Sequence, residues 1–213
     1  MTELKKYIEI FDYLSSPHLP QTPESTIIFG RQDERVAQAA GDLVLANLVD
    51  VAVITGGIGK DSGDLTEYGY RSEAHFLAEK LRTDSLKRGF TLPDLYLDEA
   101  ATNGGENARN SINILNEHNH TSDTLTAVAH ATSARRLTEM LRNEGKIINN
   151  KIPTVFIKPT SYDFDASNTA DQKEARDELL RLYEWPTKEW LLPQTDLPDE
   201  LVEFANDEKK SVK

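Results

Sequence analysis

Short apolar segments alternate with longer amphipathic segments along most of this chain. The short segments are rich in β-branched residues and apolar at successive positions, which predicts buried strands at 26–29, 51–54, 95–97, 125–128 and 154–157. The longer segments repeat apolar residues at spacings of three and four, which predicts helices at 33–48, 71–88, 105–117, 133–144 and 169–184. The same spacing predicts an N-terminal helix over about 2–15 and a short helix at 197–204, followed by a frayed end at 206–213.

Strands that are apolar on both faces belong in a sheet that is covered on both sides. Their alternation with helices predicts a parallel sheet wound by right-handed crossovers. We therefore expect an α/β fold: a three-layer Rossmann-like sandwich with about five parallel strands and an additional C-terminal helical segment at about 168–205. Residues 1–213 are expected to form one domain, with its core at about 25–160.

The charge balance narrows the classes of partner. The 213 residues include 36 acidic and 24 basic side chains, a formal net charge of −12, and the basic runs are too short to form a phosphate-binding patch. We expect neither nucleic acid nor membrane as a partner, and neither a signal peptide nor a membrane-spanning helix is recognised. The absence of cysteine excludes disulfides, thiolate catalysis and Cys-ligated zinc, and fits a cytoplasmic protein.

No metal site is expected, because the five histidines form no HExxH pair. His118 and His120 are interpreted as part of a solvated loop.

Glycines and polar residues gather after the predicted strands. Seven of the eleven glycines follow strands, at positions 30, 56, 57, 59, 63, 104 and 105. The carboxyl ends of parallel strands share one edge of the sheet, where ligands bind in this class of fold. Their common location therefore favours a ligand site over isolated turns.

The loop at 55–63 is the strongest single feature. Gly56, Gly57 and Gly59 would let backbone N–H groups approach an anion, although a plain turn also explains them. The loop is neither a Walker A motif nor a clean GxGxxG fingerprint, which disfavours an NAD oxidoreductase. Lys60 either pairs with a ligand anion or is a solvated surface charge.

Two glutamates are the candidate catalytic residues. Glu106 follows Asn103 at the spacing of a capping box, so a structural role competes with a catalytic one. Glu73 begins a predicted helix, where the helix dipole alone favours a carboxylate. Asn107 is not explained by capping and is a candidate ligand contact.

Cations also converge on this edge, so we expect a locally positive pocket suited to a small anion. The contributing residues are Arg31, Arg35, Lys60, Arg71, Arg135 and Arg136. Of Arg135 and Arg136, one is expected to face the anion and the other the solvent. His130 is interpreted as a satisfied loop-edge histidine rather than a catalyst, and no nucleophile–base–orienter set is recognised.

Several blocks together resemble the YdcF-like family, a domain of unknown function that includes the SanA and ElyC proteins. They are residues 54–59, 70–74, 101–109 and 134–136, and a Trp-Pro element at 184–190. The chain is most similar to the soluble members. The membrane-anchored relatives carry an N-terminal hydrophobic segment that is missing here, so an envelope role is not expected to transfer. A His that many relatives carry three residues before the Arg of 134–136 is also missing.

The resemblance implies a Rossmann-like fold with a pocket at the strand carboxyl ends and a nucleotide-like ligand, S-adenosylmethionine being the candidate. Carried over by position, the pocket residues are Gly30, Arg35, Gly56, Gly57, Arg71, Glu73, Asn103, Glu106, Asn107 and Arg136.

The leading hypothesis is therefore a small-ligand-binding protein, and whether it is an enzyme stays open. The expected ligand-binding residues are Gly30, Arg31, Arg35, Thr55, Gly56, Gly57, Gly59, Lys60, Arg71, Asn103, Asn107, Arg135 and Arg136. The alternative is a hydrolase or transferase acting on a phosphorylated or nucleotide substrate, with Glu73 or Glu106 as general base. A third hypothesis is an interaction protein whose acidic surface meets a basic partner.

Overall fold

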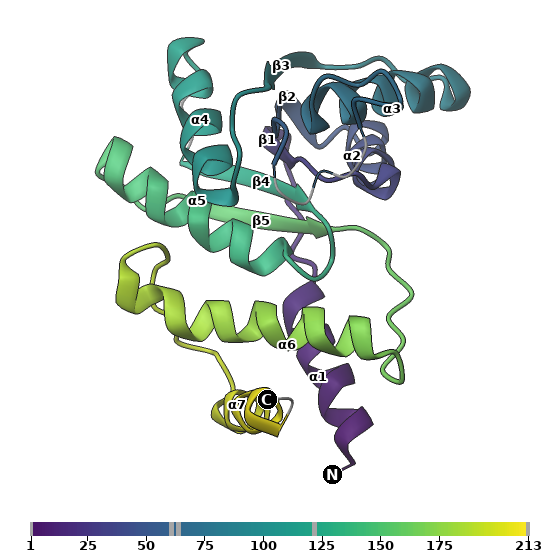
Figure 1. The fold of residues 1–213 in the computed structure, drawn as a ribbon. Helices are drawn as coiled ribbons and strands as arrows, with labels where there is room; N and C mark the ends of the chain where they lie inside the picture. Colours follow the sequence, from purple (N-terminus) through teal and green to yellow (C-terminus); the bar gives the residue numbers. More distant parts are fainter. Residues whose placement is uncertain (1, 60–61, 63–64, 121–122, 212–213) are drawn as a thin grey trace.

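A five-stranded parallel sheet forms the centre of the computed structural model (Figure 1), which describes residues 2–59, 62, 65–120 and 123–211. The strands are β1 (Glu24–Phe29), β2 (Val49–Thr55), β3 (Asp94–Asp98), β4 (Thr124–Ala129) and β5 (Thr154–Pro159). Their order in the sheet is β3-β2-β1-β4-β5, and every neighbouring pair is parallel. The predicted α/β class, strand number and parallel sense are confirmed.

Helices cover both faces of the sheet. They are α1 (Glu3–Ser15), α2 (Glu34–Leu45), α3 (Glu73–Arg88), α4 (Gly104–Glu117), α5 (Ala134–Asn149), α6 (Thr169–Glu184), the short 3-10 helix η1 (Trp185–Lys188) and α7 (Asp199–Ser211). In Figure 1, α2 and α3 lie on one side of the strands and α4 and α5 on the other. This is the predicted three-layer arrangement.

Alternate residues of each strand enter two separate hydrophobic clusters. In β1, Ile27 and Phe29 join the cluster beneath α4 and α5, whereas Ile28 joins the one beneath α2 and α3. In β2, Val51 and Val53 divide from their neighbours in the same way. The continuous apolar pattern of these strands follows from the need to fill both clusters.

The C-terminal segment packs with the N-terminus. Figure 1 shows α1, α6 and α7 together beside α5, with the two chain termini on the same side of the molecule. Tyr7 of α1 and Phe204 of α7 form an edge-to-face ring pair with centroids 5.1 Å apart. The expected frayed end at 206–213 is wrong for the described residues, because α7 continues to Ser211.

One helix end was also misplaced. The helix predicted at 133–144 is too short, because α5 continues to Asn149. A Cβ at Gly145 would lie 2.5 Å from Cδ of Pro153, so this glycine serves close packing and does not end the helix. In the part of the chain that the structure describes, no helix is long and apolar enough to span a membrane.

The sheet order creates a topological switch point. The chain leaves β1 toward β2 on one side, while β4 lies on the other side of β1. The loops after β1 and β4 therefore diverge at the carboxyl edge, which is where ligands bind in open parallel sheets.

Candidate functional site

A cleft of about 750 Å³ opens at the carboxyl edge of the sheet. The loops after β1, β2 and β3 form one side, including Gly30, Gly59 and Asn103, and one face of α6 forms the other. Trp185 of η1, part of the Trp-Pro element, also lines the cleft. The location matches the expected ligand edge, and α6 contributes more of the lining than the sequence predicted.

The backbone N–H groups of the glycine loop after β2 donate hydrogen bonds within the protein. The N–H of Gly56 donates to the carbonyl of Asp98, and the N–H of Gly57 donates to that of Ala101, at 2.9 and 2.6 Å. The N–H of Gly59 donates to Oγ of Ser62 at 2.7 Å. These three N–H groups already have acceptors, so the expected anion cradle is not what this backbone forms.

The carbonyls of this loop also cap α3. Gly57 and Gly56 accept hydrogen bonds from the N–H groups of Glu73 and Ala74, at 3.2 and 2.8 Å. Gly56 has a φ of 138°, a backbone conformation that residues other than glycine rarely adopt. The loop therefore joins β2 to the start of α3, and its glycines serve this connection.

Glu73 lies against the backbone at the floor of the cleft. A Cβ on Gly30 would come within 2.7 Å of Glu73 Oε2, and one on Gly56 within 3.0 Å of the same atom. Ser62 donates to Glu73 Oε1 at 3.0 Å. The bare backbone of the two glycines thus makes room for this carboxylate, which lines the cleft as the sequence predicted.

The start of α4 is capped by the expected residues, except that Glu106 reaches back to Thr102, one residue before the N-cap Asn103. Oδ1 of Asn103 accepts from the N–H of Glu106 at 3.0 Å, and Oε2 of Glu106 accepts from the N–H and Oγ of Thr102 at 2.7 and 2.9 Å. These bonds from Thr102 hold the pKa of the Glu106 carboxyl below its usual value. Glu106 is not part of the cleft lining, so its expected role as general base is not supported by its position.

Asn107 and Thr55 belong to a buried polar group beneath the cleft. Thr55 Oγ1 donates to Asp98 at 2.7 Å and lies 3.2 Å from Oδ1 of Asn107. Asn107 also lines the cleft, whereas Thr55 does not. Thr55 therefore supports the site from below.

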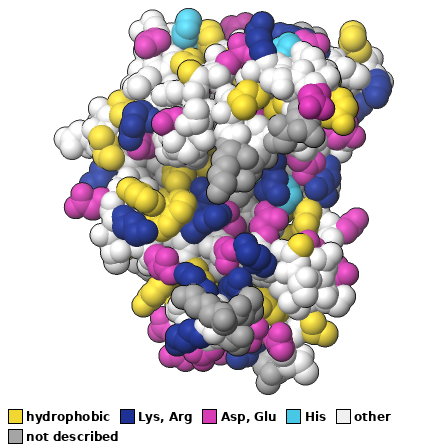
Figure 2. All heavy atoms as spheres, in the orientation of Figure 1, with side chains coloured by type: hydrophobic (Ala, Val, Ile, Leu, Met, Phe, Trp, Pro, Cys, Tyr) yellow, Lys and Arg dark blue, Asp and Glu magenta, His cyan; other side chains and the backbone are white. Residues whose placement is uncertain are grey.

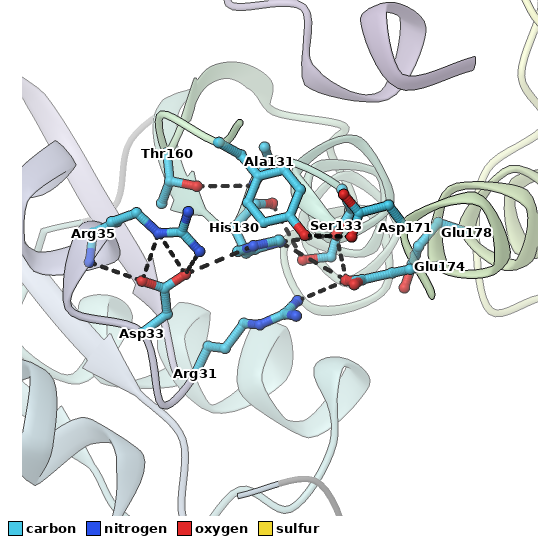
Figure 3. A network of polar contacts seen from close by, with 12 residues as sticks. Arg31, Asp33, Arg35, His130, Ala131, Ser133, Thr160, Asp171, Glu174 and Glu178 are labelled. Carbon is cyan, nitrogen blue, oxygen red and sulfur yellow. Dashed lines mark hydrogen bonds and ion pairs between the residues drawn. The ribbon is translucent and has the colours of Figure 1, made fainter. Parts of the chain in front are cut away.

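Only two of the five expected arginines reach the cleft. Arg31 and Arg136 line it, and each is held by a carboxylate of α6: Arg31 by Glu174 at 3.0 Å, and Arg136 by both oxygens of Glu178 at 2.5 and 3.2 Å. Figure 3 shows Arg31 and Glu174 pointing toward each other.

The other three arginines have different partners. Arg35 pairs with Asp33 at 2.7 Å, and its guanidinium lies 4.9 Å from the Tyr162 ring centre. Arg71 pairs with Glu99 at 2.6 Å and is 67% exposed. The expectation that they converge on the cleft is wrong, because acidic neighbours outside it hold them.

Arg135, the third of these arginines, also lies outside the cleft. Its guanidinium lies 3.9 Å from the ring centre of Tyr13 in α1 and pairs with Asp196. The side chain is only 17% exposed, so it faces neither the cleft nor the solvent. Arg135 instead fastens the N-terminal helix to α5.

The described lining of the cleft is balanced in charge rather than positive. Four basic residues are matched by four acidic ones: Arg31, Arg136, Lys173 and Arg181 against Glu73, Glu174, Asp177 and Glu178. Lys60 lies outside the described residues. The face shown in Figure 2 likewise carries basic and acidic side chains intermixed. The expected locally positive pocket is thus not what the described residues form.

His130 lies in a buried network beside the cleft (Figure 3). Its Nδ1 is 2.8 Å from Oγ1 of Thr132, its Nε2 is 3.7 Å from Asp33, and the Thr132 hydroxyl donates to Glu174 at 2.7 Å. Burial, reinforced by Arg31, lowers the pKa of His130 to about 4. The imidazole is therefore neutral at pH 7.

The order Thr132–His130–Asp33 has the outline of a nucleophile, base and orienter. Thr132 is only 1% exposed, however, and its proton is already donated to Glu174. A substrate could not reach this hydroxyl. The network therefore joins the β1 and β4 loops to α6, consistent with the interpretation of His130 as a satisfied histidine.

The residues of α6 were not predicted as site residues. Lys173, Glu174, Asp177, Glu178 and Arg181 follow helical spacing along one face, a signal that is present in the sequence. The same pattern is typical of a solvated helix, so it did not distinguish a site. Among the described residues, no group of three or more metal-ligating side chains comes together.

Comparison with known proteins adds no relative: no family model matches the chain, and no curated protein matches it.

Proposed function

We propose that this protein binds a small ligand that carries both an ammonium and a carboxylate beside a nucleoside-like part, with S-adenosylmethionine as the candidate. The observation that carries the proposal is the charge-balanced cleft at the carboxyl edge of a parallel sheet. The ammonium of such a ligand can meet the Glu73 carboxylate, and its carboxylate can meet the N-terminal turn of α4. A polyanion meets four carboxylates instead.

Separate groups in the cleft match separate parts of such a ligand. Glu73 offers a carboxylate to a ligand ammonium or to ribose hydroxyls. The first turn of α4, opened by Gly104, favours a ligand carboxylate, because helix N-termini have N–H groups without intrahelical partners. Trp185 adds an aromatic surface to the lining.

Gly104 is required for this arrangement. A Cβ there would lie 2.9 Å from Leu137, 3.0 Å from Met140 and 3.1 Å from Arg136. Without a side chain, the start of α4 comes close to α5 and to the guanidinium of Arg136. This brings the helix N-terminus and a cation to one part of the cleft.

A hydrolase or transferase acting on a phosphorylated substrate is supported less well. Such an enzyme needs cations available to the phosphate. Arg31 and Arg136 are already paired with Glu174 and Glu178. We therefore keep ligand binding as the function and place the protein, as part of the same proposal, among distant YdcF-like proteins of the cytoplasm.

Isothermal titration calorimetry tests the proposal. S-adenosylmethionine is titrated into the folded protein in parallel with S-adenosylhomocysteine and ATP. We expect saturable one-site binding of S-adenosylmethionine, weaker binding of ATP, and at least about tenfold weaker S-adenosylmethionine binding by Glu73→Gln. Glu203→Gln, which removes the same charge from an exposed position of α7, is the matched control. Absence of binding heat with folded wild-type protein would refute the proposal.

A further inference from the structure

Helix α6 presents a row of carboxylates to the cleft, and each holds a cation that also lines it. Glu174 pairs with Arg31, and Glu178 pairs with Arg136 and Arg181. Asp177 pairs with Lys173 at 2.9 Å. Every described cation of the cleft is therefore neutralised by one helix.

The pairs differ in how accessible they are. Arg136 and Glu178 are 13% and 5% exposed, so breaking this pair leaves an uncompensated buried charge. Arg31 and Glu174 are 40% and 32% exposed, and both line the cleft. Of the two cleft pairs that join α6 to residues of other elements, that of Arg31 and Glu174 is therefore the one that a ligand can separate with less rearrangement.

Glu174 is held in place from two sides. Its Oε1 accepts from Nη1 of Arg31 at 3.0 Å and from Oγ1 of Thr132 at 2.7 Å. Thr132 is in turn fixed through His130 in the buried network (Figure 3). The Glu174 carboxylate is thus fixed beside Arg31 by hydrogen bonds, unlike that of a freely rotating surface side chain.

We propose that Glu174 is the specificity-determining residue of the cleft: by neutralising Arg31, it excludes polyphosphates and leaves the site to ligands that carry both charges. The inference rests on the proposed function, because it concerns the same cleft. A nucleoside triphosphate would place several negative charges beside Glu174, Asp177 and Glu178, an unfavourable arrangement in a partly buried site.

The experiment measures inorganic tripolyphosphate binding in metal-free, low-salt buffer by calorimetry. Glu174→Gln keeps an oxygen that can accept from Thr132 and Arg31 but removes the charge. We expect this variant to bind tripolyphosphate at least about tenfold more tightly than wild type. Glu203→Gln, with the same change in net charge on exposed α7, should leave the affinity unchanged.

A second substitution identifies the cation responsible. Adding Arg31→Gln to Glu174→Gln should abolish the gain in tripolyphosphate affinity, because the Arg31 guanidinium that Glu174 would have neutralised is then absent. An unchanged tripolyphosphate affinity in folded Glu174→Gln, or a gain that survives Arg31→Gln, would overturn the proposal.

A second variant keeps the proposal testable if Glu174→Gln fails to fold. Glu174→Ala, which removes the same charge, is then measured in its place, and an unchanged tripolyphosphate affinity in this folded variant overturns the proposal. Tripolyphosphate binding is measured without S-adenosylmethionine. The two results can separate the proposals. If wild type does not bind S-adenosylmethionine while Glu174→Gln binds tripolyphosphate more tightly, the proposed function is refuted and the role of Glu174 in excluding polyphosphates is retained.

Discussion

Replacing Gly30 by alanine tests the close backbone packing at the floor of the cleft. The added Cβ would lie 2.6 Å from the carbonyl oxygen of Thr55, 2.7 Å from Glu73 Oε2 and 2.9 Å from Glu73 Cβ. The Glu73 side chain could move aside. The carbonyl of Thr55 cannot do so freely, because it accepts the N–H of Gly30 itself at 2.6 Å.

Overpacking of this kind costs about 1–3 kcal/mol, and a backbone contact places Gly30→Ala near the upper value, about 2–3 kcal/mol. For a chain of this size, each kcal/mol lowers the melting temperature by about 2–4 °C, so a fall of about 4–12 °C is expected. Because the backbone must shift beside Glu73, ligand binding should weaken as well.

Urea denaturation followed by circular dichroism measures the change in the free energy of unfolding. Gly105→Ala in the first turn of α4 is the matched control, since its Cβ would meet only Asn103 Oδ1 at 3.4 Å. Better helix propensity should make this variant neutral or more stable by up to about 1 kcal/mol. A Gly30→Ala variant as stable as wild type, or one no less stable than Gly105→Ala, would refute the packing argument.

Three further predictions concern residues around the cleft. Glu178→Gln should lower the free energy of unfolding by about 3 kcal/mol in urea, because Arg136 then loses its buried partner; a loss under about 1 kcal/mol would contradict this. Asn103→Ala should cost about 1 kcal/mol through loss of the helix cap, and Asn103→Ser should restore most of it. His130 has a pKa of about 4 when folded against an ordinary value of 6.5, so protonation favours the unfolded chain, and stability should fall as the pH drops from about 6.5 to 4. The full effect is about 3 kcal/mol, and the same fall in His130→Asn would show that other groups cause it.

The fold was predictable because its signals are local. Each strand is a short apolar run, and each covering helix repeats its apolar residues at helical spacing, so the class, the number of strands and their parallel sense followed. The ends of helices were predicted less well where contacts with residues distant in sequence determine the local structure. The helix predicted at 133–144 continues to Asn149, and Gly145 within it leaves room for Pro153 to pack closely.

The location of the cleft was predictable for the same reason, because the residues after parallel strands must meet at one edge. The partner of each charge was not. Arg31 pairs with Glu174, 143 residues away, and nothing in the local sequence of either residue specifies the other. The expectation of a positive pocket counted the loop arginines and omitted the carboxylates that α6 brings to them.

The glycine loop shows a related limit. A backbone suited to approach a phosphate is also suited to approach a carbonyl. Gly56 and Gly57 use their N–H groups for Asp98 and Ala101, which only the fold brings near. Composition and spacing predict close approach at such a loop but do not identify what approaches.

The most direct test of the account is a crystal structure of the protein grown with S-adenosylmethionine. The account predicts ligand density in the cleft between Gly30, the start of α4 and α6, with the ligand ammonium near Glu73. An empty cleft at saturating ligand, or density at another surface, would contradict it.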